Sequence, residues 1–215
     1  MKVDTYLKQN GFRFIREKGH DSISEAQGLY SYHKRIKYKK DNPEVYPKLF
    51  ELILKDLMIN KFGFEAENGV KITDEGSGGD YDVLAVNHLN EMVYIECKTG
   101  KNIKKRDMEE FYKRHLFLKP SLSIVVFDQA KKDVEKYLAL MRSVLTDDSK
   151  RRDKTIAKMK EYQYPNYDII PEPEREFAYH MDRNLFFCSG EDIERAVAHC
   201  LRYFNGVVKQ SSYWC

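Results

Sequence analysis

The sequence contains no apolar run that approaches the roughly 20 residues a membrane-spanning helix requires. Its first residues, MKVDTYLKQNGFRF, also lack the apolar stretch of a secretory signal peptide. Charged residues make up 33% of the chain and the mean hydropathy is -0.66, values that are typical of a soluble protein. We therefore expect a cytoplasmic protein that does not bind a membrane.

Motifs built on paired cysteines or on glycine-rich loops are missing as well. The four cysteines, Cys97, Cys188, Cys200 and Cys215, form no CxxC motif, which argues against a zinc ribbon or a thioredoxin-type site. The chain also contains no GxGxxG, no P-loop and no nucleophile elbow. These absences disfavour a metabolic α/β enzyme that binds a nucleotide cofactor.

Positive charge is unevenly distributed along the chain. The 37 basic and 34 acidic residues give a net charge of +3, which by itself says little about partners. Basic residues are nevertheless concentrated in the segments 33–40, 101–106 and 150–160. A solvated surface explains any one segment equally well, whereas the three together suit a polyanion such as nucleic acid.

Hydrophobic periodicity predicts alternating helices and strands. Apolar residues at helical spacing follow Pro43 and precede Gly63, so a helix is expected to start near Asp41 or Asn42 and to stop at Gly63. The other expected elements are strands at 64–72, 81–86 and 92–97, a helix at 107–118, a strand at 121–127, a helix at 131–145, a strand at 184–190 and a helix at 191–204. This order predicts an α/β fold with a mixed sheet flanked by helices.

The chain length fits one elaborated domain over residues 1–215. We expect its core at 43–148. A basic segment, 1–42, precedes this core, and an α/β extension, 149–215, follows it.

The segment DYDVLAVNHLNEMVYIECK, residues 80–98, reads as two strands joined by a turn centred on Leu89. In an antiparallel hairpin with that centre, Leu84 faces Tyr94 and Asp82 faces Glu96. Because side chains alternate along a strand, Lys98 shares a face with Glu96. The hairpin therefore predicts that Asp82, Glu96 and Lys98 meet at one end of the sheet.

Two opposed carboxylates repel each other unless positive charge lies between them. Lys98 supplies part of that charge, and a divalent cation with a preference for oxygen ligands, such as Mg²⁺, supplies more. The competing interpretation is an ordinary surface ion pair with Lys98. Asp80 is a competing candidate for the role of Asp82, although its position after GSGG suits a turn residue. Neutralising Asp82 or Glu96 is expected to stabilise the metal-free fold.

Asp82 followed by Glu96-Cys97-Lys98 resembles the motif of the PD-(D/E)xK nuclease superfamily, without the proline of its name. GGDYDVLAV and YIECKTG are similar to segments of Mrr-like restriction endonucleases and of nuclease domains in CRISPR-associated effectors. The Phe50-Glu51 pair in the preceding helix matches those families in type and order. The resemblance covers residues 43–128 and implies a restriction endonuclease-like core with the element order αβββαβ.

The resemblance implies a Mg²⁺-dependent endonuclease that hydrolyses phosphodiester bonds, with Mn²⁺ able to substitute. Asp82, Glu96, Glu51 and the backbone carbonyl of Cys97 would hold the metal ion. Lys98 would orient the attacking water and offset the charge that grows on the phosphate. Glu51, Asp82, Glu96 and Lys98 are thus the expected catalytic residues.

Basic residues after the motif are expected to contact the nucleic-acid backbone, namely Lys101, Lys104, Lys105 and Arg106. We expect DNA in preference to RNA, and a homodimer is possible because related resolvases form one. His115 reads as a structural histidine. The alternative function is a catalytically inactive nucleic-acid-binding module of the same fold.

Overall fold

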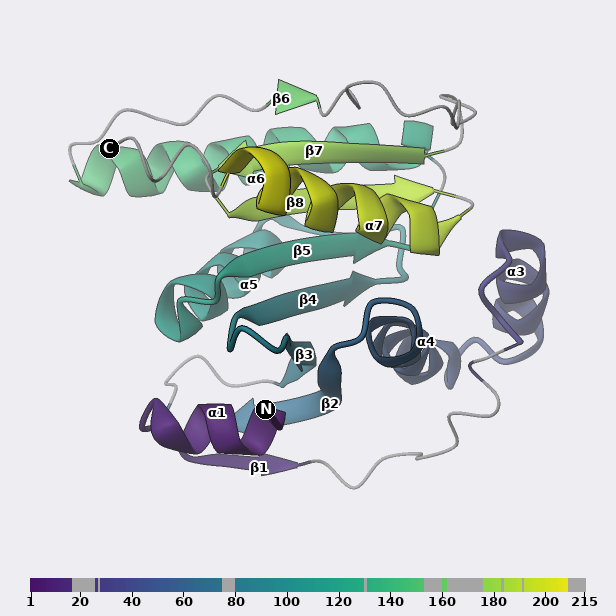
Figure 1. The fold of residues 1–215 in the computed structure, drawn as a ribbon. Helices are drawn as coiled ribbons and strands as arrows, with labels where there is room; N and C mark the ends of the chain where they lie inside the picture. The colour runs from purple at the N-terminus through teal and green to yellow at the C-terminus, as the bar shows by residue number, and fades with distance from the viewer. Residues whose placement is uncertain are drawn as a thin grey trace.

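The computed structural model describes residues 1–16, 26, 28–74, 80–129, 131–152, 160–161, 176–182, 184–190 and 192–208. Within them, eight strands form one sheet in the order β1-β2-β3-β4-β5-β8-β7-β6 (Figure 1). The strands are β1 Phe14–Arg16, β2 Glu65–Ile72, β3 Tyr81–Val86, β4 Met92–Lys98, β5 Leu122–Phe127, β6 Lys160–Glu161, β7 Glu176–Asp182 and β8 Leu185–Gly190. The helices are α1 Val3–Gln9, α3 Tyr32–Asp41, α4 Tyr46–Asn60, α5 Lys105–Leu118, α6 Lys131–Arg152, α7 Ile193–Tyr203 and the π-helical turn η1 Phe204–Val208.

The sheet is mixed, and this confirms the predicted fold class. Neighbouring strands are antiparallel from β1 to β4, parallel across β4, β5 and β8, and antiparallel again from β8 to β6. Helices and strands alternate from α4 onward in the expected sequence of helix, three strands, helix and strand. The endonuclease-like identity of this core stays a prediction. None of the helices in the described part of the chain combines the length and apolar composition that a bilayer crossing requires.

One helix boundary was predicted wrongly. Asp41 is the last residue of α3, and α4 begins only at Tyr46. Pro47 lies in the first turn of α4, where its missing N–H costs no hydrogen bond. The sequence contains two prolines near this point, and Pro43 belongs to the link between the helices.

The register of the β3–β4 hairpin is the predicted one. Leu84 pairs with Tyr94 and Val86 with Met92. Asn87 fixes the turn, because its Oδ1 accepts hydrogen bonds from the backbone N–H groups of Leu89 and Glu91, each at 2.9 Å. The short polar side chain thus replaces backbone hydrogen bonds that the turn cannot make.

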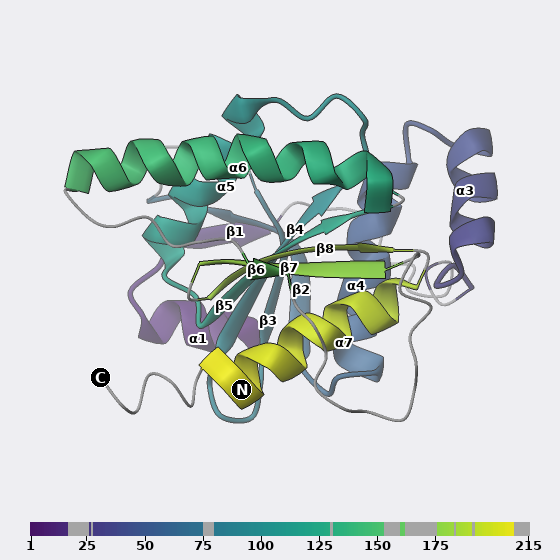
Figure 2. The same ribbon diagram turned by 90° about the horizontal axis from the view of Figure 1, so that it is seen from above.

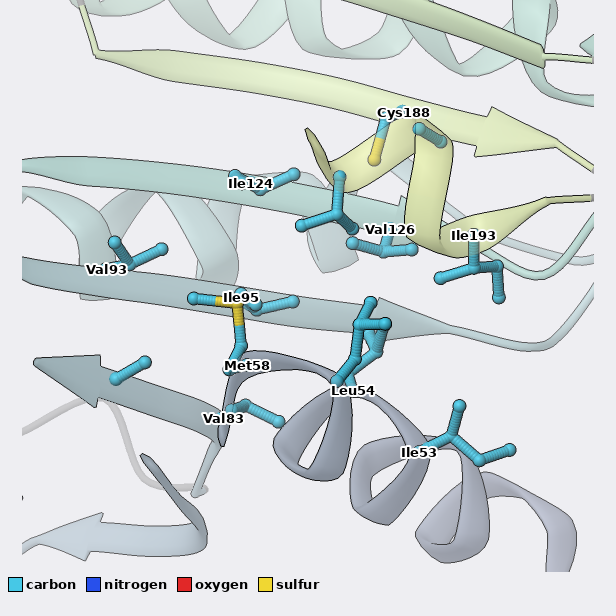
Figure 3. Close-up of a cluster of buried hydrophobic side chains, with 14 of the residues drawn as sticks. Ile53, Leu54, Met58, Val83, Val93, Ile95, Ile124, Val126, Cys188 and Ile193 are labelled. Carbon is cyan, nitrogen blue, oxygen red and sulfur yellow. The ribbon is translucent and has the colours of Figure 1, made fainter. Parts of the chain in front are cut away.

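Two hydrophobic cores lie on opposite faces of the sheet. Residues of α1, α5 and α6 pack on one face, and residues of α4 and α7 pack on the other. Figure 2 shows α6 and α7 on opposite sides of the strands. Leu54 and Met58 of α4 point toward the sheet in Figure 3, where Met58 lies between Val83 and Ile95. A sheet covered on both faces explains why β3, β4 and β5 are mostly apolar on both of their faces.

The basic helix α3 is tied to the sheet by a buried ion pair. Arg35 is 0% exposed and its Nε lies 3.1 Å from Oδ1 of Asp128, directly after β5. The Tyr46 hydroxyl donates to Oδ2 of the same carboxylate at 2.7 Å, and the Asp128 amide donates to the carbonyl of Lys98 at 2.9 Å. Part of segment 33–40 therefore serves the interior instead of facing a polyanion.

Replacing Asp128 with alanine should destabilise the fold by about 3–5 kcal/mol, because the buried charge of the Arg35 guanidinium would lose the carboxylate that balances it. Urea denaturation measures this loss of unfolding free energy. Asp74→Ala is the matched control. It breaks the pair with Arg13, whose side chain is 84% exposed, and should cost less than about 1 kcal/mol. Equal losses in the two variants would show that the Arg35–Asp128 pair does not stabilise the fold.

Candidate active site

Ionisable side chains gather where β3 begins and β4 ends. Antiparallel pairing places these two strand ends next to each other, so that Asp82 lies beside the last residues of β4. Its Oδ2 accepts a hydrogen bond of 2.6 Å from the backbone N–H of Cys97. Nζ of Lys98 lies 2.7 Å from Oε1 of Glu96. The structure thus brings together the three residues that the hairpin argument selected.

An irregular point in β3 sets the position of Asp82. Tyr81 packs in the core beneath α5, whereas Val83 packs in the core beneath α4. Residues two apart on a regular strand face the same side, so the alternation breaks at Asp82. The opposite residue on β2 is Gly69, whose φ of 60° is open to glycine at little cost. The regular alternation of side chains along β3 therefore does not predict the direction of the Asp82 carboxylate.

Glu96 is buried and is surrounded by hydrogen-bond donors. Its side chain is 3% exposed, and Nη2 of Arg114 lies 2.9 and 3.0 Å from its two oxygens. The Tyr94 hydroxyl also donates to Oε2. Burial raises the pKa of Glu96, but Lys98 and Arg114 outweigh it and hold this pKa below its usual value. Glu96 is therefore ionised and fully engaged by protein groups.

Arg114 and Tyr94 were not selected from the sequence. Arg114 lies on the buried stripe of α5, three residues after Phe111 and four before Leu118. An arginine among apolar residues at helical spacing indicates a buried anion, because a guanidinium is rarely buried without a partner. That signal was present in the sequence and could have identified Arg114.

Glu51 approaches the site from α4. It is 5% exposed, and burial raises its pKa to about 7 even though Lys48 opposes the shift. Nζ of Lys48 lies 3.2 Å from Glu51 and 2.8 Å from Asp80, so this lysine bridges the two acids. Burial raises the pKa of Asp80, but the contact with Lys48 outweighs it and keeps this pKa low. Asp80 therefore belongs to the rim of the site as the partner of Lys48.

Asp82 is the carboxyl group with the least compensation. Burial raises its pKa well above the usual value, and the neighbouring charges of Glu96 and Glu51 raise it further. The Cys97 amide and Lys98 lower it, but by less. Four carboxyl groups thus share the site with three cationic groups: Glu51, Asp80, Asp82 and Glu96 against Lys48, Lys98 and Arg114.

The donor set fits Mg²⁺ in chemical type, because hard carboxylate and carbonyl oxygens are its preferred ligands. The uncompensated charge at Asp82 points the same way. Within the described ranges, however, no three acidic, histidine or cysteine side chains are arranged so that they could hold a metal ion. Glu51 is directed to Lys48, and Glu96 is directed to Arg114 and Lys98. The arrangement is that of an ion-paired site.

The basic residues after the motif divide into two pairs. Lys105 lies 2.7 Å from Asp147, and Arg106 lies 2.8 Å from Glu110, so both are engaged in ion pairs. Lys101 and Lys104 line a pocket instead. Most of the basic segment 150–160 and the GSGG turn lie outside the described residues.

His115 is a structural residue, as predicted. Its ring is buried, and its Nδ1 lies 2.9 Å from the hydroxyl oxygen of Ser123 in β5. The ring also stacks on Tyr112 at a centroid distance of 5.8 Å. These contacts pin α5 to the sheet, on the side of the helix that also carries Arg114.

The contacts of the two central acids revise the expectation that neutralising either one stabilises the fold. The pKa of Asp82 is raised on folding, so its stabilising contribution is present at acid pH and is lost as the pH rises through the folded pKa. The pKa of Glu96 is lowered, so its contribution is present above the unfolded pKa. At pH 7.5, Asp82→Asn should therefore stabilise the fold, whereas Glu96→Gln should destabilise it by about 1–3 kcal/mol.

Thermal melts of both variants in EDTA test these opposite signs. Asp4→Asn, which neutralises a carboxylate of the Arg16 pair outside the site, is the control and should change the midpoint little. A rise of the melting midpoint in Glu96→Gln, or a fall in Asp82→Asn, would contradict the electrostatic balance described above.

Comparison with known proteins identifies no relative of this chain. The chain matches no family model, and the searches of curated proteins and of solved structures give no significant match. The residues of the site and the motif that they form are therefore the features that indicate a function.

Proposed function

We propose that the protein is a metal-dependent nuclease that hydrolyses phosphodiester bonds, with DNA as its substrate. The observation that carries the proposal is the convergence of Asp82, Glu96 and Lys98 at the junction of β3 and β4, with Glu51 close enough to affect the pKa of Asp82. These four residues are the set that the PD-(D/E)xK resemblance selects. A homodimer and a cytoplasmic location stay predictions.

Asp82, Glu51, Glu96 and the carbonyl of Cys97 are the groups proposed to hold Mg²⁺, or Mn²⁺ in its place. When bound, the cation supplies Lewis-acid polarisation of the phosphate and a lowered pKa for water. The protein prepares this site by leaving Asp82 without a full counter-charge. Binding would require Glu51 and Glu96 to exchange ammonium contacts for the cation, and both Lys48 and Lys98 have the flexible side chains that such an exchange needs.

Lys98 is the proposed catalytic cation. Glu96 and Asp82 raise its pKa even though burial opposes this, so it stays protonated at neutral pH. An ammonium group beside the two acids can hold the attacking water and stabilise the charge that develops on the phosphate. Arg114 and Tyr94 act through Glu96, whose orientation they fix, and we regard them as positioning residues.

The alternative is an inactive nucleic-acid-binding module, and one observation favours it. Both oxygens of Glu96 are already bound by Arg114, and Tyr94 and Lys98 add further hydrogen bonds. A carboxylate with so many protein donors has little need of a metal ion. The two functions differ in whether the bond is cut, and a cleavage assay separates them.

Supercoiled plasmid and labelled single strands, incubated with Mg²⁺, Mn²⁺ or EDTA, test the proposal. We expect cleavage with either metal and none in EDTA. Lys98→Ala should lower the cleavage rate by about 100- to 1000-fold, because a donor aimed at developing charge is lost. Asp82→Asn should reduce cleavage below detection.

Lys113→Ala and Asp4→Asn are the matched controls, since each removes the same type of charge from an exposed or partly exposed position outside the site. Both should cleave like the wild type. Salt-dependent binding by the wild-type protein without cleavage under any metal condition would overturn the nuclease and support the inactive module.

A further inference from the structure

A pocket of about 540 Å³ lies between the loop that follows β4 and the helix α6. The loop contributes residues 101–104, and α6 contributes Lys136, Tyr137 and Leu140. The loop starts three residues after Lys98, so the pocket is a neighbour of the candidate active site along the chain. The pocket is an open hollow on the surface, and its volume has room for one unit of a polymer.

The charge of the pocket has one sign. Lys101, Lys104 and Lys136 are among its seven lining residues, and none of those seven is acidic. The adjacent Lys105 and Arg106 differ, because Asp147 and Glu110 neutralise them. The three lysines therefore face no acidic side chain among the residues that line the pocket, and a positive hollow concentrates anions.

Tyr137 holds the two walls of the pocket together. Its hydroxyl donates a hydrogen bond to the carbonyl of Lys101, and its ring stacks on Phe127 of β5 at a centroid distance of 5.4 Å. Phe127 pairs with Lys98 in the register of β4 and β5. These contacts join the backbone of the loop and the helix α6 to the strand pair that carries Lys98.

The distance from the candidate active site suits neighbouring nucleotides on one strand. Three residues of extended chain separate the Cα atoms of Lys98 and Lys101 by at most about 10 Å. A strand in a B-form duplex rises by about 3.4 Å per nucleotide. A strand that passes Lys98 therefore reaches the pocket within about three nucleotides.

We propose that this pocket binds the sugar-phosphate backbone of the substrate strand, up to three nucleotides from the phosphate that is cut. Lys101, Lys104 and Lys136 contact phosphate oxygens, and Leu140 packs against the sugar. Phe127 stacks on the Tyr137 ring, and Nζ of Lys136 lies 5.0 Å from the centroid of that ring. The ring is therefore no platform for a base, and the contact is independent of sequence. The inference rests on the proposed function and assigns Lys136 of α6 to substrate binding.

Fluorescence anisotropy tests the proposal without cleavage. It measures the binding of a labelled single strand and of a labelled duplex in EDTA at several salt concentrations. The binding constant K falls as the salt concentration rises, so a plot of log K against log salt has a negative slope. Each lost phosphate contact reduces the magnitude of this slope by about 0.7 for a single strand and about 0.9 for a duplex. The double variant Lys101→Ala/Lys136→Ala should therefore reduce the magnitude of the slope by about 1.4 for the single strand and about 1.8 for the duplex. Its binding should be roughly tenfold weaker at moderate salt.

Two lysine variants outside the pocket are the controls. Lys8→Ala removes an exposed lysine of α1, and Lys113→Ala removes an exposed lysine of α5. Both should keep the wild-type slope and affinity. A double variant that binds like these controls would overturn the pocket while leaving the nuclease intact.

Failure of the two proposals can be told apart. If the wild type binds nucleic acid and the salt dependence of the double variant is reduced by the expected amount, the pocket proposal is supported even when no cleavage occurs. If the wild type binds neither the single strand nor the duplex, the proposed function fails and the pocket proposal fails with it.

Discussion

Repulsion among acidic groups at the junction of β3 and β4 is the constraint on which the site depends. Hairpin pairing brings Asp82 to Glu96, and packing of α4 adds Glu51. The fold tolerates this concentration of charge by surrounding Glu96 with Arg114, Tyr94 and Lys98, and by giving Glu51 a contact with Lys48. From the described residues, Asp82 receives a backbone amide and the favourable field of Lys98, so the electrostatic cost is concentrated on one residue. Natural proteins retain such a cost where it serves function.

The strands around the site extend this constraint to the rest of the molecule. The central strand β4 is antiparallel to β3 and parallel to β5, so the carboxyl ends of β4 and β5 lie at the edge where β3 begins. Asp128 follows β5 at that edge and fixes α3 and α4 through Arg35 and Tyr46. The loop after β4 leaves the same edge and forms the lysine pocket with α6. The acidic cluster, the buried ion pair and the basic pocket are thus consequences of one strand arrangement. In α/β proteins, binding sites commonly lie at the carboxyl ends of the parallel strands.

Much of the fold followed from local sequence patterns, and the site followed only in part. The hairpin register was predictable because apolar residues pair along its whole length and Asn87 supplies the turn chemistry. The link between α3 and α4 was not predictable, because two prolines offered equally good helix starts. The position of Arg114 on the apolar stripe of α5 was a signal in the sequence, but its partner Glu96 depends on how α5 packs against β4, which is a tertiary contact. The break of alternation at Asp82 lies opposite Gly69 of another strand, and the sequence of β3 alone contained no sign of it. Periodicity predicts elements and faces, whereas contacts between elements decide which charges meet.

The central claim is that the acidic groups beside Lys98 bind a divalent cation, and anomalous scattering from a crystal soaked in Mn²⁺ tests it most directly. The account predicts one anomalous peak bounded by the carboxylate of Asp82 and the carbonyl of Cys97, with Glu51 or Glu96 turned toward it. The same soak of Asp82→Asn should show no peak there. A wild-type crystal at saturating Mn²⁺ that shows no peak at this position, with Glu51 still on Lys48 and Glu96 still on Arg114, would contradict it.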